Sequence, residues 1–122
     1  MKRITILIAD DEVEIADLVA LHLQKEGYHI IKAFDGKTAV QAVQTQTIDL
    51  AVLDIMMPGM DGLEVCRHLK QIVPTSPIIL LTAKDDMTTR SAGMSLGASE
   101  FLVKPVNPHV LIACIHTLLL TR

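Results

Sequence analysis

Polar and charged side chains follow four apolar runs of this chain, at the point where each run ends. In chain order these side chains are Asp10, Asp11, Glu12, Asp54, Thr82 and Lys104. Carboxylates brought together would repel each other by about 1 kcal/mol or more per pair, and a divalent cation would offset that repulsion. Because carboxylate oxygens are the candidate ligands, Mg²⁺ is the ion that such a site favours.

A carboxylate beside a metal ion, a hydroxyl group and an ammonium group can accept a phosphoryl group. One of the carboxylates would be the nucleophile, the ion and Lys104 would neutralise charge, and the Thr82 hydroxyl would donate a hydrogen bond. Taken singly, an aspartate after a strand is usually a helix cap, and a Lys-Pro pair is usually a loop. The joint occurrence of these residues in this order therefore favours phosphoryl transfer to an aspartate.

The elements that must position these residues are strands and helices in alternation. The apolar runs predicted as strands are residues 4–9, 28–33, 50–53, 78–81 and 100–103. The first helix would carry Ile15, Leu18, Val19 and Leu23 on one face and end before Gly27. The later helices are predicted over residues 36–46, after an Asp61 cap, over about 86–96, and from Asn107 or Pro108 to the end.

Five strands that alternate with five helices predict one three-layer α/β domain with a parallel sheet and right-handed crossovers. In an open parallel sheet, ligands bind at the carboxyl ends of the strands. The polar residues of the first paragraph all follow strands, so we expect them to meet at that edge.

The composition excludes several other classes of protein. The chain has 122 residues, a net charge of −3, 50% hydrophobic residues and only 2% aromatic residues. Such a chain is too hydrophobic to be disordered, and it lacks the basic patches and stacking rings of a nucleic-acid module. No apolar run is long enough to span a membrane, and the two cysteines and five histidines show no zinc-ligand spacing. We therefore expect a cytoplasmic protein. Cys66 and Cys114 fall on the third and last predicted helices, which lie on opposite faces of the sheet in the expected fold, so they should not pair.

Two rival chemistries disagree with particular residues. A dinucleotide-binding domain needs a glycine-rich loop after its first strand, where this chain has Asp10, Asp11 and Glu12. Haloacid-dehalogenase-type phosphatases carry a second aspartate two residues after the nucleophile, where this chain has Met56.

Four segments together resemble the motifs of the receiver domain of two-component response regulators. They are residues 8–12 (IADDE), 53–62 (LDIMMPGMDG), 81–83 (LTA) and 97–105 (GASEFLVKP). The resemblance covers essentially the whole chain, as one receiver domain over residues 1–122. It implies a flavodoxin-like, doubly wound (βα)₅ sandwich whose five-stranded parallel sheet has the order 2-1-3-4-5.

The resemblance also implies roles for single residues. Asp54 would be the phosphoacceptor. Mg²⁺ would be bound by Asp11, by Asp54 and by the backbone carbonyl of Met56, and by Asp10 through a water molecule.

Three further residues have implied roles. Lys104 would contact the phosphoryl group and Asp54, and its peptide bond to Pro105 would be cis. Thr82 would be the switch hydroxyl and Phe101 the switch aromatic, although a phenylalanine on a short strand is as often a core residue.

The implied function is a switch rather than an enzyme, since the chain would catalyse only its own phosphorylation and dephosphorylation. A sensor histidine kinase would be the phosphodonor, and the output would be transcription, through an output domain outside this chain. The domain itself would bind neither nucleic acid nor a membrane. The alternative is a docking module on the same fold that works without phosphorylation, and the complete set of site residues argues against it.

The sequence departs from the winged-helix transcription-factor branch of the family on the face that this branch uses to dimerise. That face consists of the fourth helix, the fifth strand and the last helix. Arg90 and Glu100 are kept, but charged positions usual in the branch are occupied by Ser99, Val110 and Cys114, and Val106 replaces a common phenylalanine. We therefore expect a homodimer, or a contact with an output domain, that depends on apolar contacts. The alternative is that residues outside this chain cover the apolar surface of the last helix.

Met56 and Lys84 occupy positions that tune phosphoryl lifetime in the family.

Overall fold

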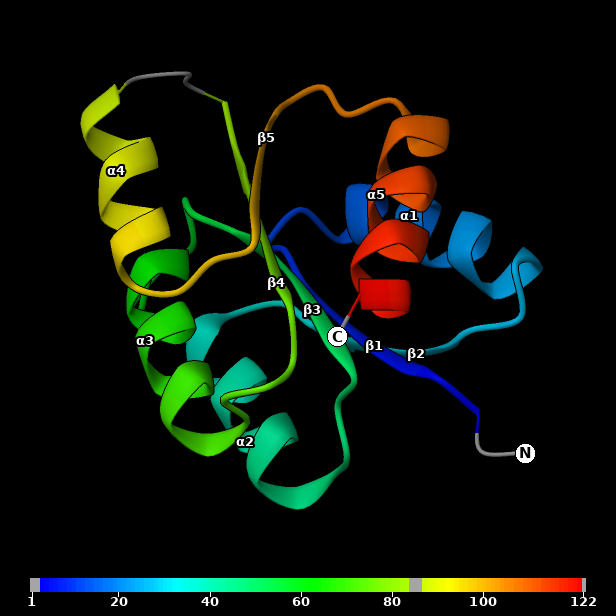
Figure 1. The fold of residues 1–122 in the computed structure, drawn as a ribbon, viewed down its shortest axis with the longest axis horizontal. Helices are drawn as coiled ribbons and strands as arrows, with labels where there is room; N and C mark the ends of the chain where they lie inside the picture. Colours follow the sequence, from blue (N-terminus) through cyan, green and yellow to red (C-terminus); the bar gives the residue numbers. More distant parts are fainter. Residues whose placement is uncertain (1–2, 84–86, 122) are drawn as a thin grey trace.

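The computed structural model describes residues 3–83 and 87–121. Its strands are β1 (Thr5–Ala9), β2 (His29–Ala33), β3 (Leu50–Asp54), β4 (Ile78–Thr82) and β5 (Glu100–Val103). Its helices are α1 (Val13–Lys25), α2 (Gly36–Thr45), α3 (Gly62–Ile72), α4 (Met87–Ser95) and α5 (Pro108–Thr121). The strands are parallel and lie in the order β2-β1-β3-β4-β5, as predicted (Figure 1).

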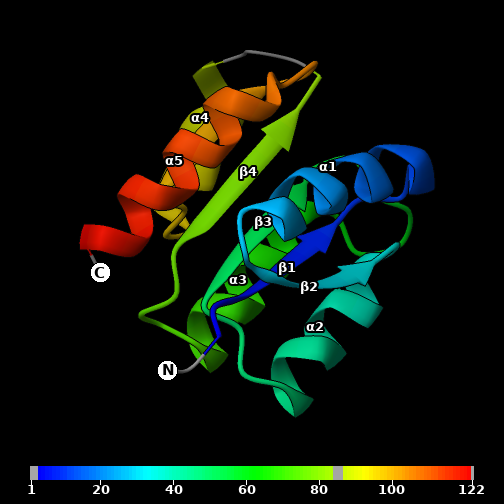
Figure 2. The ribbon, with the colours of Figure 1, turned by 90° about the vertical axis from the view of Figure 1, so that its right-hand side faces the viewer.

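The helices cover both faces of the sheet. Helices α1 and α5 lie on one face, and α2, α3 and α4 lie on the other (Figures 1 and 2). Successive strand residues point to opposite faces, so Ile6 and Ile8 pack with α1 and α5, whereas Leu7 and Ala9 pack with α2 and α3. The three inner strands β1, β3 and β4 therefore contribute to two cores, which explains why their sequences are apolar almost without a break.

Local signals in the sequence place several helix ends. The Asp35 and Asp61 side chains accept hydrogen bonds from the Thr38 and Glu64 amides, at 2.7 and 3.0 Å, and so begin α2 and α3. Gly27 follows the end of α1 with a φ of 93°, which glycine adopts without strain. The predicted start of the fourth helix, near residue 86, lies outside the described residues.

The predicted inner face of the first helix is partly wrong. Leu18 is 54% exposed, whereas Leu23 is buried as predicted and α1 buries Ala16 and Ala20 with it against the sheet. Small side chains at Ala16 and Ala20 let the helix approach the strands closely. This approach rotates Leu18 toward solvent and leaves Val19 half-buried at the side of α5.

The two cysteines are both free and belong to different layers. Cys66 is buried with the α3 side of the sheet, and Cys114 is half-buried on α5 with the opposite side. Both positions agree with the sequence expectation. None of the helices in the described ranges has the length and apolar character needed to cross a membrane.

Candidate metal and phosphoryl site

Four carboxylates meet at the carboxyl ends of β1 and β3. Asp10, Asp11, Glu12 and Asp54 each present one oxygen atom, and these atoms all lie within 4.8 Å of one another. The pairing of Ala9 with Leu53 across the two strands brings the residues after them together. Asp10 and Asp54 are only 2% and 3% exposed, whereas Asp11 and Glu12 face solvent.

Lys104 is the cation of this cluster. Its Nζ atom lies 3.1 Å from Asp10 Oδ2, 3.2 Å from Asp54 Oδ2 and 3.6 Å from Glu12 Oε1. The residue follows β5, and its backbone amide donates a hydrogen bond to the Thr82 carbonyl at 2.6 Å. Its peptide bond to Pro105 is cis. The structure therefore brings residues from β1, β3 and β5 to one point.

The electrostatics of the site raise the pKa of both its buried carboxyl group, Asp54, and its ammonium group, Lys104. Burial raises the pKa of Asp54 to about 6, the nearby Asp10 charge raises it too, and Lys104 opposes both effects. For Lys104, burial lowers the pKa, but the hydrogen bonds and charges of Asp10 and Asp54 outweigh it, so the pKa is raised. Lys104 thus stays protonated at neutral pH, while the ionised form of Asp54 needs further positive charge to be stabilised.

The donor atoms fit a hard divalent cation. Carboxylate oxygens from two buried and two exposed residues meet here, and Mg²⁺ prefers oxygen ligands of this kind together with bound water molecules. The Met56 backbone amide lies 3.4 Å from Asp54 Oδ1, so the loop after β3 folds over the same carboxylate. The side chain of Met56 is 70% exposed and leaves the site open to solvent.

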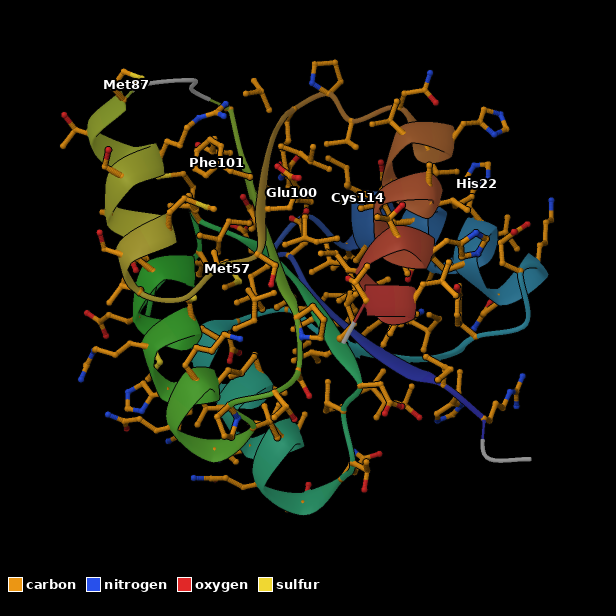
Figure 3. The ribbon with its side chains drawn as sticks, viewed as in Figure 1. His22, Met57, Met87, Glu100, Phe101 and Cys114 are labelled. Carbon is orange, nitrogen blue, oxygen red and sulfur yellow. The ribbon has the colours of Figure 1, made fainter. Side chains whose placement is uncertain are left out.

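The two candidate switch residues lie on neighbouring strands. Thr82 ends β4 and is 4% exposed, directly beside the site strand β3. Phe101 is 3% exposed, and its ring lies between β5 and α4 (Figure 3). The Arg90 guanidinium carbon is 5.0 Å from the centre of this ring. Phe101 is therefore part of the core on the α4 side and lies outside the carboxylate cluster.

Two residues at the site, Glu12 and Gly36, were given no role by the sequence analysis. Glu12 adds a fourth carboxylate and contacts Lys104, although we assigned it no ligand role. Gly36, at the start of α2, closely approaches Met60 in the loop after β3, and no spacing rule connects these two segments. Lys84 lies outside the described residues.

Comparison with known proteins gives a consistent family. The response regulator receiver domain model matches residues 6–116. The regulatory protein VanR of Enterococcus faecium is 45% identical over 108 residues, which are 88% of this chain and 46% of VanR. The alkaline phosphatase synthesis transcriptional regulatory protein PhoP of Bacillus subtilis (strain 168) is 40% identical over 114 residues, 93% of this chain and 48% of PhoP. The chain thus spans about half the length of these relatives.

The fold has close structural relatives as well. The crystal structure of a CheY-like response regulator receiver domain protein from Methanospirillum hungatei JF-1 superposes with a TM-score of 0.94. That alignment covers 97% of this chain and 94% of the other, at 28% sequence identity. The chain is therefore a member of the response regulator receiver domain family, homologous to the regulators VanR and PhoP.

Proposed function

We propose that this domain is a phosphorylation-activated switch of a two-component system and that Asp54 is its phosphoacceptor. The observation that carries the proposal is the position of Asp54, which is buried among carboxylates with Lys104 Nζ 3.2 Å from its Oδ2 atom. A carboxylate oxygen of Asp54 would attack the phosphorus atom of a phosphohistidine on a sensor kinase. The new O–P bond forms as the P–N bond breaks, and the histidine leaves with the bonding electron pair.

The residues around Asp54 have distinct roles in this step. Asp11, Asp54 and the Met56 carbonyl would hold Mg²⁺ directly, and Asp10 would hold it through water. The bound ion supplies positive charge next to the phosphoryl oxygens. Lys104, which is protonated and fixed by Asp10, neutralises further charge on the group being transferred.

The response would begin at Thr82. An aspartyl phosphate adds about one and a half to two negative charges to the site. The Thr82 hydroxyl would donate a hydrogen bond to the new phosphoryl oxygen, and Phe101 would adjust its packing against α4. This movement would change the face formed by α4, β5 and α5.

The same face is the proposed contact with a second copy of the domain. Its β5–α5 side has a shallow groove of about 370 Å³ lined by Leu102, Val110, Ala113, Cys114 and Leu118, together with Glu100 and Thr117. Val110 is 53% exposed, and the lining contains one charged residue. Apolar contacts would therefore dominate this homodimer.

The relatives VanR and PhoP are regulatory proteins about twice the aligned length, and PhoP is a transcriptional regulator. We accordingly propose that the natural output is transcription, through an output domain. The domain would work in the cytoplasm, where it would meet the kinase.

Intact mass spectrometry after treatment with a small phosphodonor and Mg²⁺ tests the central step. A chain that takes no phosphoryl group would instead fit a docking module that works without phosphorylation.

A further inference from the structure

The loop that connects β3 to α3, residues 55–61, closes on the residue that begins α3. A Cβ atom added to Gly62 would lie 2.4 Å from the Asp54 carbonyl oxygen and 2.7 Å from the Ile55 Cα atom. The Gly62 amide also donates a hydrogen bond to the Ile55 carbonyl at 2.9 Å. The two ends of the loop are thus in direct contact beneath Asp54.

Near its α3 end, the same loop is held by α2, an element that contributes no side chain to the site. A Cβ atom added to Gly36 would lie 2.2 Å from the Met60 carbonyl oxygen and 2.7 Å from the Met60 Cβ atom. Gly36 is buried and is not among the described glycines with positive φ. The close approach of two backbones, and not an unusual conformation, therefore requires glycine at this position.

The start of α2 is itself firmly fixed. The Asp35 side chain accepts a hydrogen bond from the Thr38 amide, and the Asp35 carbonyl accepts one from the Ala39 amide at 3.2 Å. Ala39 is fully buried in the core between the sheet and the helices. Because α2 cannot easily move away, a larger residue at Gly36 would push on Met60.

We propose that Gly36 is a positioning residue for the metal site, because its contact with Met60 sets the path of the loop that presents the Met56 backbone to Asp54. Met60 and Met56 are close along the chain, and hydrogen bonds hold the loop at its Met56 end. The Met57 amide donates one to the Ile55 carbonyl at 3.2 Å, and the Met56 amide approaches Asp54 Oδ1. A displacement of Met60 therefore reaches Met56 through a short closed loop. The inference rests on the proposed function, since it concerns the same ion.

The test uses the methionines as reporters. Three of the six methionines of the chain, Met56, Met57 and Met60, lie in this loop. In Gly36→Ala, the methyl NMR signals of Met60 and Met56 should shift in the metal-free protein. The Mg²⁺ dissociation constant, measured by calorimetry, should rise by about tenfold, as when a group that supports a metal ligand is lost.

Gly93→Ala is the matched control. Its added Cβ would meet Leu80 Cδ1 at 2.6 Å, so it likewise crowds a helix, but on α4, against the sheet and against a side chain that can move. This variant should lower the melting temperature while its Mg²⁺ dissociation constant stays that of the wild type. Equal affinity in Gly36→Ala and wild type, with unmoved Met56 signals, would overturn the inference.

A second variant keeps the test decisive if Gly36→Ala does not fold. Asp35→Ala removes the cap that fixes Gly36 without adding bulk, and it should shift the Met60 signal and weaken Mg²⁺ binding in the same direction. Unchanged signals and affinity in Asp35→Ala would contradict the role of α2. A wild-type chain that binds no Mg²⁺ would contradict the proposed function instead, so the two failures are distinguishable.

Discussion

Lys104 and Asp54 form an ion pair, 3.2 Å between Nζ and Oδ2, that joins the end of β5 to the end of β3 across the intervening strand β4. A change in charge at Asp54 therefore acts directly on the strand that carries Phe101 and borders α4. This link connects the proposed chemistry at one edge of the sheet with the proposed output face.

Removal of the Asp54 charge should stabilise the metal-free protein. Asp54→Asn keeps the shape of the side chain and leaves Lys104 paired with Asp10. Burial raises the pKa of Asp54 to about 6 from a usual value of 3.8, so the ionised form is less stable in the folded than in the unfolded chain. Allowing for water at the rim of the site, we expect the free energy of unfolding at pH 8 to rise by about 1–2 kcal/mol.

The sign of the pH dependence follows from the direction of that shift. The folded chain binds the Asp54 proton more tightly than the unfolded chain, so the destabilisation is full above pH 6 and disappears as the pH falls toward 3.8. Denaturant titrations of both proteins in a chelator, at several pH values, measure this difference. A stability gain in Asp54→Asn that grew on acidification would contradict the assigned environment.

Addition of Mg²⁺ should stabilise the wild-type chain. An ion that binds only the folded state raises the free energy of unfolding by about 2.7 kcal/mol when its concentration is 100 times its dissociation constant. Thermal melts with Mg²⁺ should therefore show a higher midpoint than melts in sodium chloride of equal ionic strength. Asp11→Ala, which removes an exposed carboxylate of the cluster, should lose most of this gain. Equal gains in both proteins would place the ion elsewhere.

Much of this fold could be predicted because its signals are local. Asp61 precedes its helix by one residue and caps it, and the three inner strands β1, β3 and β4 are short apolar runs. Leu18 was misplaced because periodicity does not show how closely α1 approaches the sheet, which depends on Ala16 and Ala20. Gly36 was missed as a support of the loop because its partner, Met60, lies 24 positions away and only the folded chain brings the two together.

Thr82 should couple phosphorylation to the output face without being needed for the chemistry. In Thr82→Ala, Asp54 should still take a phosphoryl group, because Lys104 and the carboxylates are intact. We expect the methyl signal of Met94 on α4 to shift on phosphorylation of the wild type and to shift much less in this variant. Thr82→Ser, which keeps the hydroxyl, is the matched control and should behave as the wild type. A full Met94 response in Thr82→Ala would assign the coupling to another residue.

The proposed dimer should depend on apolar contacts. The groove between β5 and α5 is lined mainly by apolar side chains, so phosphorylation-promoted association should persist or strengthen in high salt. Val110→Asp should abolish it, whereas Leu21→Asp, at an exposed leucine on α1, should not. Sedimentation at low and high salt measures the association. Dissociation of the wild-type dimer by salt alone would show that ion pairs hold it.

The central claim is that Asp54, held by Lys104 within the carboxylate cluster, accepts a phosphoryl group. Incubation with acetyl phosphate and Mg²⁺, followed by intact mass spectrometry, tests it most directly. We predict a mass increase of about 80 Da in the wild type, which corresponds to one phosphoryl group. The increase should require Mg²⁺ and be absent in Asp54→Asn. A wild-type chain that gains no mass, or an Asp54→Asn chain that gains as much, would contradict the account.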